Sequence, residues 1–186
     1  MCQTQTVSLL LWSLLHCPLF ATLRISDSNN RSSRNKMRAI IQRVATASVS
    51  VGEKPVSAIG HGLCVLIGIF DGDTDKDLEY IVRKLLNIRL FDSQEGKGWT
   101  RNVTEVDGSL LLVSQFTLCH VLKGNKPDFH NAMKGSDSKP MFDQLVAACA
   151  AGYKPNKIAT GAFGEYMHVS IVNDGPVTIT LDSREK

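Results

Sequence analysis

A continuous apolar run, GLCVLIGIF at residues 62–70, limits the possible folds of this chain more than any other segment. It shows no alternation of apolar and polar residues and glycines bound it, which is typical of a strand buried on both faces. A second run, SLLLVSQFTL at residues 109–118, predicts another buried strand.

Between these two strands the apolar residues follow a helical period. They recur at i, i+3, i+4 and i+7 within residues 71–91, which predicts an amphipathic helix. Asp73 or Thr74 is placed to cap it, and acidic residues in its first turn suit the helix dipole. The acidic residues therefore indicate the start of a helix rather than a metal site. The apolar stripe consists of Leu78, Ile81, Val82 and Leu85.

The same stripe appears again after a polar loop at residues 119–138, and it predicts a second helix. Pro140 suits the first turn of this helix, and Gly152 is a candidate for its C-terminal stop. Its apolar residues are Phe142, Leu145, Val146 and Cys149.

The rest of the chain is typical of strands. Residues 38–51 are rich in β-branched residues, and a turn follows at residues 52–56. Residues 164–172 and 176–181 predict two more strands near the C-terminus. We therefore expect an α/β protein of compact mixed β-sheets, barrel-like or layered, with two helices packed on one side. Residues 37–186 contain no repeat or linker, which predicts a single domain.

The cysteines and histidines suggest no metal site. The five cysteines are scattered, odd in number and form no C-x-x-C pair, so neither a disulfide framework nor a zinc site is indicated. This usage indicates a reducing compartment. No two histidines have a metal-binding spacing, and no glycine-rich phosphate loop occurs. We expect no metal and no cofactor.

The net charge of +3 comes from the N-terminal segment. Residues 1–36 hold four basic residues and one acidic residue, which leaves 17 of each sign for residues 37–186. A body without net charge argues against tight nonspecific binding of nucleic acid, which needs clustered positive charge. It is compatible with recognition of a nucleic-acid end by a small pocket.

Residues 1–36 have two interpretations. The apolar run at residues 7–20 has the length of a signal peptide and is too short to span a membrane, but no charged segment precedes it. The Arg- and Ser-rich segment that follows is typical of an organellar transit peptide. Alternatively, the natural chain starts at Met37, which opens the first strand. We expect a cytoplasmic protein without membrane association in its mature form, or a mitochondrial or plastid one if residues 1–36 are a transit peptide.

The common catalytic sets have weak support. Ser114 lies near two histidines and an aspartate in the sequence, which are the residue types of a catalytic triad. However, Ser114 lacks the G-x-S-x-G turn that presents such a nucleophile. The histidines and the aspartate are His120, His130 and Asp128.

Two features that depend on backbone groups remain. Residues 114–118, SQFTL, end the second apolar strand, and a strand that stops there exposes free N–H groups. Gly175 and Pro176 follow Asn173 and Asp174 between two β-like runs. Because proline interrupts a sheet ladder, a turn is the simplest interpretation of this pair.

Four segments of the chain, in this order, resemble the D-aminoacyl-tRNA deacylase family, also called the D-tyrosyl-tRNA deacylase family. The resemblance spans essentially all of residues 37–186 and leaves residues 1–36 outside. Ser-Gln-Phe-Thr and Gly-Pro-Val-Thr each occur once at the expected separation, which makes the resemblance specific. The segments are MRAIIQRV at 37–44, LLVSQFTL at 111–118, KGNKPDFH at 123–130 and NDGPVT at 173–178.

The resemblance implies a homodimeric enzyme that hydrolyses the ester between a D-amino acid and the terminal adenosine at the 3′ end of tRNA. It implies that a cis Gly175–Pro176 peptide enters the pocket of the partner subunit. The backbone N–H groups of that pocket would polarise the ester carbonyl, and the terminal ribose hydroxyl would help to activate water. The residues that form it would be Ser114, Gln115, Phe116 and Thr117.

A rigid pair of carbonyls at Gly175–Pro176 is suited to selecting D-amino acids over L-amino acids. If it orients the α-amino group of the substrate, a D side chain points out of the pocket and an L side chain meets rigid backbone. Rejection by such a clash does not depend on which side chain the amino acid carries. Many D-amino acids are therefore expected substrates, as is achiral glycine on Gly-tRNA(Ala).

Two alternatives stay open. In one, the Thr117 hydroxyl is the nucleophile, although no base lies at an obvious position beside it. In the other, the chain is a non-catalytic nucleic-acid-binding relative. Arg43 is expected to brace the Gly-Pro loop or the interface, and Phe129 to stack on the terminal adenine or lie in the core. Lys123 and Lys126 are candidates for phosphate contacts.

Overall fold

The two apolar runs form neighbouring parallel strands in the computed structural model, which describes residues 36–184. Strand β3 (Gly62–Gly68) pairs with β4 (Ser109–Ser114), and β7 (Ile158–Thr160) pairs with the other edge of β4, also in parallel. Alternate side chains of β3 and β4 pack into two separate apolar clusters on opposite faces of the sheet. The prediction that these strands are buried on both faces is therefore confirmed.

A long first strand organises the rest of the sheet. Strand β1 (Arg38–Val51) runs antiparallel to β3, to β2 (Lys54–Ile59) and to β8 (His168–Asp182). At the far side of the sheet, the Ser57 hydroxyl on β2 donates a 2.7 Å hydrogen bond to the Thr160 carbonyl on β7. This contact brings the two ends of the strand order together, so the mixed sheet curls into a nearly closed barrel, as predicted.

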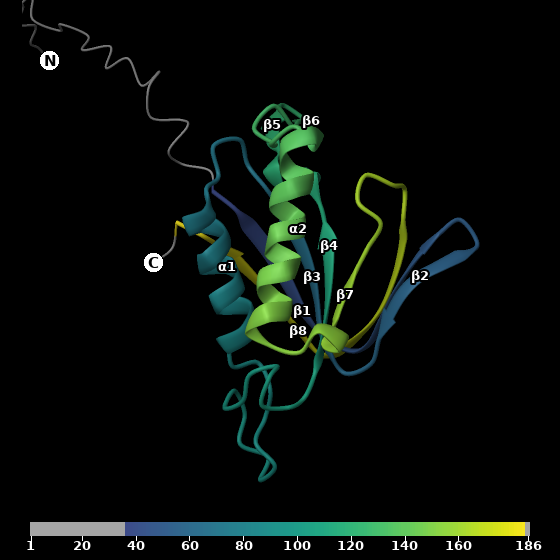
Figure 1. Cartoon of the computed structure of the whole chain (residues 1–186), viewed down its shortest axis with the longest axis vertical. Coiled ribbons are helices and arrows are strands. Elements are labelled where there is room, and N and C mark those ends of the chain that lie inside the picture. The colour runs from purple at the N-terminus through teal and green to yellow at the C-terminus, as the bar shows by residue number, and fades with distance from the viewer. Residues whose placement is uncertain (1–35, 185–186) are drawn as a thin grey trace, which may run out of the picture.

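Two helices cover one face of this sheet (Figure 1). Helix α1 (Asp75–Asn87) begins after Thr74, whose N–H and hydroxyl both donate to the Asp77 carboxylate, at 2.9 and 2.8 Å. Such contacts satisfy donors that the first turn of a helix leaves free. The predicted apolar stripe of α1 packs on the sheet, which confirms the amphipathic reading.

Helix α2 (Gly135–Gly152) starts earlier than predicted. Pro140 is its sixth residue and lies in the second turn, so the prediction of a first-turn proline is wrong. Because proline has no N–H, the Ser136 carbonyl loses its helical partner there. Gly152 ends the helix as predicted, and a Cβ atom there would lie 2.8 Å from Leu86 Cδ1 of α1. The glycine therefore lets the two helices approach closely.

The sequence patterns missed the shortest elements. Residues 119–138 are not all loop, because β5 (Val121–Lys123) and β6 (Lys126–Asp128) form a hairpin turned by Gly124, at φ 63°. The second apolar run does not stay extended to residue 118. Its strand ends at Ser114, and residues 116–119 form a 3₁₀ turn, η2 (Phe116–Cys119). This break positions the site described below.

Three cysteines, Cys64, Cys119 and Cys149, are free and buried in the described part of the chain. Burial raises the pKa of their thiols to about 11, 12 and 12 respectively, so they remain protonated at neutral pH. Within residues 36–184 no helix combines the length and the apolar character that a membrane crossing requires. The two interpretations of residues 1–36 fall, apart from Lys36, outside the described residues.

A buried carboxylate connects the residue before β1 with the segment that follows β3. Asp73 is 6% exposed and accepts the N–H groups of Met37 at 2.9 Å and Phe70 at 2.7 Å. Burial, reinforced by the nearby Asp77, raises the pKa of Asp73 to about 7. The folded state therefore binds one more proton than the unfolded state between about pH 4 and pH 7, so stability falls as pH rises through this window.

Asp73→Asn is expected to remove this pH dependence, because the amide cannot ionise. Between pH 5 and pH 8 the free energy of unfolding of the wild type should fall by roughly 2 kcal/mol more than that of the variant. Urea unfolding of both proteins at the two pH values measures the difference. If the free energy of unfolding changes with pH in the same way for both proteins, Asp73 does not titrate as proposed. A loss of stability that is equal at both pH values reflects only the changed hydrogen bonds of the variant.

Candidate functional site

A cavity of about 640 Å³ opens at the carboxyl ends of the parallel strands. One wall is the end of β4 and the η2 turn, and the others are the segment that enters α2 and residues 163–169 before and within β8. Ligands of α/β sheets bind at this edge because the strands end there and loops with free backbone groups replace them. The four residues predicted as catalytic, Ser114, Gln115, Phe116 and Thr117, all line this cavity.

The η2 turn presents unused backbone donors. Gln115 N–H still pairs with the sheet, donating 2.7 Å to the Ile67 carbonyl, and Leu118 N–H donates to the Gln115 carbonyl. The N–H groups of Phe116 and Thr117 lie between them and donate to no acceptor among residues 36–184. The first donors of a helical turn have no partner within the turn. The predicted release of N–H groups at the strand end is therefore observed.

The turn is held rigidly by the strand beneath it. A Cβ atom at Gly68, the last residue of β3, would lie 2.7 Å from Leu118 Cβ and 3.2 Å from the Gln115 carbonyl oxygen. Arg38 Nη1 donates to the Leu118 carbonyl at 3.0 Å, and Cys119 Sγ donates to the Ile69 carbonyl. These contacts fix η2 from its buried side, so the two free N–H groups are preorganised.

The side chains of the turn provide no general base. The Thr117 hydroxyl accepts a hydrogen bond from the Gln115 amide nitrogen. His120 is near, but its Nδ1 lies 3.0 Å from the backbone carbonyl of Thr117 rather than from the hydroxyl. In the described residues no carboxylate or imidazole is hydrogen-bonded to the Thr117 hydroxyl. The geometry therefore favours the backbone over the side chain of Thr117.

The triad considered from the sequence does not assemble. Lys123 Nζ, and then the backbone N–H and Nδ1 of His130, contact the Asp128 carboxylate on hairpin β5–β6, and they hold the pKa of Asp128 well below its usual range. Within residues 36–184, Ser114 forms no hydrogen bond with this group or with His120. Three or more potential metal ligands also do not converge anywhere in that range.

An exposed aromatic ring, that of Phe116, lines the cavity, and the ring of Phe129 packs against it. Phe116 is 56% exposed and its ring meets Phe129 edge to face, with centroids 5.2 Å apart. Phe129 is half-buried and does not itself line the cavity. Stacking of Phe129 on a terminal adenine remains a prediction, and the exposed ring of Phe116 is the nearer candidate for it.

The Gly-Pro pair is a bulge in one strand rather than a turn between two. Strand β8 is continuous, with Asn173 opposite Val44 and Val177 opposite Arg43. Residues 174–176 therefore have no partner on β1 and bulge out of the ladder, where the missing N–H of proline has no cost. The Gly175–Pro176 peptide is cis, and Gly175 has φ 116°.

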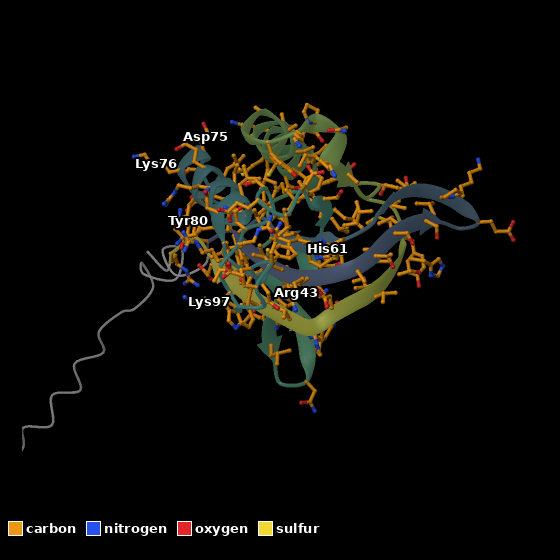
Figure 2. All side chains as sticks on the ribbon, turned by 90° about the horizontal axis from the view of Figure 1, so that it is seen from below. Arg43, His61, Asp75, Lys76, Tyr80 and Lys97 are labelled. Atoms are coloured by element: carbon orange, nitrogen blue, oxygen red, sulfur yellow. The ribbon has the colours of Figure 1, made fainter. Side chains whose placement is uncertain are left out.

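Arg43 holds the base of this bulge. Its Nε lies 3.3 Å from the Asp174 carbonyl and 3.0 Å from the Asp174 carboxylate, and Nη1 donates to the Leu90 carbonyl at 2.7 Å. The arginine lies where β1 runs beside β8 (Figure 2), with 12% of its side chain exposed. The expected contact of Arg43 with the Gly-Pro segment is therefore present.

The predicted residues do not form a single site within one chain, and Phe129, Gly175 and Pro176 line neither of two cavities. Residues 114–117 line the large cavity, whereas Arg43 and Asp174 line a smaller one of about 400 Å³ that also includes His61. The sequence patterns missed the opposite wall of the large cavity, because no local signal connects its parts to the SQFT segment. That wall includes Met133, Gly135, Ser138, Phe163, Glu165 and Met167.

Comparison with known proteins identifies the family. Residues 40–182 match the family model described as D-Tyr-tRNA(Tyr) deacylase. The chain is 54% identical to the D-aminoacyl-tRNA deacylase of Drosophila melanogaster over 150 residues, 81% of this chain and 94% of that one. It is 50% identical to D-aminoacyl-tRNA deacylase 1 of Homo sapiens over 147 residues, 79% of this chain and 70% of that one.

Solved structures agree with this match. A structure named c-Myc DNA Unwinding Element Binding Protein superposes with a TM-score of 0.76 at 50% identity, covering 78% of this chain and 97% of the other. A probable eukaryotic D-amino acid tRNA deacylase shares the fold at 21% identity, with a TM-score of 0.70. The chain belongs to the D-Tyr-tRNA(Tyr) deacylase family.

Proposed function

We propose that this protein hydrolyses the ester bond of D-aminoacyl-tRNA and releases free tRNA and the D-amino acid. Family membership supports the reaction, since relatives at about 50% identity are named for it. The observation that carries the chemistry is the pair of free N–H groups, at Phe116 and Thr117, on the wall of a cavity at the carboxyl ends of parallel strands.

These donors suit the tetrahedral intermediate of ester hydrolysis. Water adds to the ester carbonyl carbon, and the carbonyl oxygen gains negative charge opposite the N–H groups of Phe116 and Thr117. The bond to the ribose oxygen then breaks, and that oxygen takes up the proton that the attacking water has lost. A preorganised donor of this kind contributes about 10²–10³ in rate. Because Thr117 has no base beside it, we assign activation of the water to the neighbouring ribose hydroxyl of the substrate.

Selection by handedness needs a second copy of the chain. Gly175 and Pro176 lie outside the cavity of their own chain, on a bulge braced by Arg43. In the described residues β8 pairs with β1 alone, and Val172 beside the bulge is 58% exposed. A free strand edge and an exposed apolar side chain favour association. We place the bulge of each subunit at its partner's cavity, where it excludes L side chains and admits D-amino acids and glycine, including Gly-tRNA(Ala).

Parallel assays with D-Tyr-tRNA and L-Tyr-tRNA test the proposal. Release of tyrosine from the D form, with little release from the L form, is the expected result. Binding of tRNA without release would instead support the non-catalytic nucleic-acid-binding alternative. Equal release from both forms would reject chiral selection, and neither binding nor release would reject the proposed function.

Thr117→Ala distinguishes the two catalytic versions. The variant keeps the backbone N–H and loses only a hydroxyl that contacts Gln115. Deacylation is therefore expected to fall by less than about tenfold, whereas loss of a nucleophile would cost several orders of magnitude. Single-turnover hydrolysis of D-Tyr-tRNA measures the difference, and a loss beyond about 10³-fold would restore the nucleophile version.

A further inference from the structure

We propose that the first turn of α2, through the Gly135 N–H and the Ser138 hydroxyl, binds the phosphate on the 5′ side of the substrate's terminal nucleotide. This inference rests on the proposed function for the identity of the ligand. The segment before α2 is held beside the end of β3, because Met133 N–H donates a 3.0 Å hydrogen bond to the carbonyl of Ile69, the residue that follows this strand. Both Gly135 and Ser138 therefore face the cavity that holds the η2 donors.

The Ser138 hydroxyl is an unused polar group. The residue is only 8% exposed, it lines the cavity, and its hydroxyl has no hydrogen-bond partner in the described part of the chain. Serines in helices commonly donate back to the carbonyl four residues earlier. Here the Lys134 carbonyl instead accepts the N–H groups of Asp137 and Ser138. No fully buried side-chain oxygen or nitrogen in the described residues lacks a partner, so the Ser138 hydroxyl is open to the cavity and available to a ligand there.

The electrostatic potential at the N-terminus of α2 favours a negatively charged ligand. The helix has 18 residues, so its N-terminus carries the positive end of the dipole. Gly135 N–H is free because the first helical residue has no intrahelical acceptor, and a Cβ atom at Gly135 would meet nothing within 4 Å. Lys134 is exposed and forms no ion pair within residues 36–184. The first-turn acid, Asp137, does not line the cavity.

The other walls of the cavity are less suited to the phosphate. Glu165 stands on the wall before β8 and would repel it. The η2 donors are assigned to the ester oxygen, and the exposed ring of Phe116 stands beside them. In the proposed substrate the phosphodiester is the charged group nearest the ester. The N-terminus of α2 combines hydrogen-bond donors with positive potential. Hairpin β5–β6 lies at the same end of the molecule (Figure 1).

Competition between adenosine and adenosine 5′-monophosphate tests the site. Both are added as inhibitors of D-Tyr-tRNA hydrolysis, and binding of both is also measured directly by calorimetry. The monophosphate is expected to bind about tenfold or more tightly than adenosine, since hydrogen bonds to a charged group are among the stronger ones. Inorganic phosphate alone is expected to bind far more weakly, which separates a nucleotide site from a free-anion site.

Ser138→Ala is expected to remove most of this advantage and leave adenosine binding unchanged. Ser136→Ala is the matched control, because its hydroxyl is exposed, donates to Asp137 and does not line the cavity. A thermal melt of each variant checks that it is folded. Equal affinities for adenosine and its monophosphate, or a Ser138→Ala variant that keeps the advantage, would overturn the inference. A monophosphate preference that depends on Ser138 but comes without D-Tyr-tRNA hydrolysis would reject the proposed function alone.

Discussion

Phe116→Pro is expected to lower the rate of D-Tyr-tRNA hydrolysis by a further 10²–10³-fold relative to Phe116→Ala. Both variants remove the exposed ring, but only proline removes the backbone N–H. That N–H has no acceptor in the described fold, so its loss should leave the fold intact. Proline is accepted at the first residue of a helical turn, and the preceding Gln115 is not helical, with φ −143° and ψ 83°.

The comparison isolates a single backbone donor. Single-turnover rates report the chemical step, and the temperature of unfolding should agree between the two variants within a few degrees. If both variants lose the same activity, Phe116 acts through its ring and the N–H groups do not stabilise the intermediate. A drop in rate accompanied by unfolding would be attributed to the fold, so the melts must be measured on the same samples.

The sequence predicted those parts of the fold that have a local period. Two apolar runs and two amphipathic stripes gave β3, β4, α1 and most of α2. The three-residue strand β7 and the hairpin β5–β6 are too short to show a period, and β2 lies where a turn was expected. The position of Pro140 was misjudged because the first turn of α2 is polar and resembles a loop.

Only half of the site could be predicted, because only part of it carries a local signal in the sequence. Residues 114–117 stand out because a buried strand ends there in polar residues. Ser138 gives no such signal, since a serine near a helix start is common and its orientation depends on the hydrogen bond from Met133 to Ile69, just after β3. The bulge at residues 174–176 depends on pairing with β1, more than 100 residues earlier, so a turn was the natural prediction.

Gly175→Ala is expected to reduce hydrolysis of D-Tyr-tRNA by about 10²-fold or more. The new Cβ atom would lie 2.8 Å from Val177 Cγ2 and 3.2 Å from Arg43 Nη2, and φ 116° is strained for alanine. The bulge must therefore shift, and a misplacement of about 1 Å at a positioning group costs about this much in rate. Preference for D-Tyr-tRNA over L-Tyr-tRNA should also narrow, because the displaced backbone no longer excludes the L side chain.

Gly72→Ala separates this effect from backbone strain, since Gly72 has φ 84° but open space around it and does not line the cavity. It should lose stability and keep activity, and equal losses of activity in Gly72→Ala and Gly175→Ala would contradict a specific role of the bulge.

Mixing Gly175→Ala with Phe116→Pro tests whether the bulge acts across subunits. Refolded together, Gly175→Ala and Phe116→Pro chains form some dimers in which one site pairs an intact cavity with an intact bulge. Activity should then recover to about a quarter of the wild-type level, as expected for random assembly of a symmetric dimer. No recovery from a mixture that demonstrably forms mixed dimers would mean that Gly175 acts within its own chain.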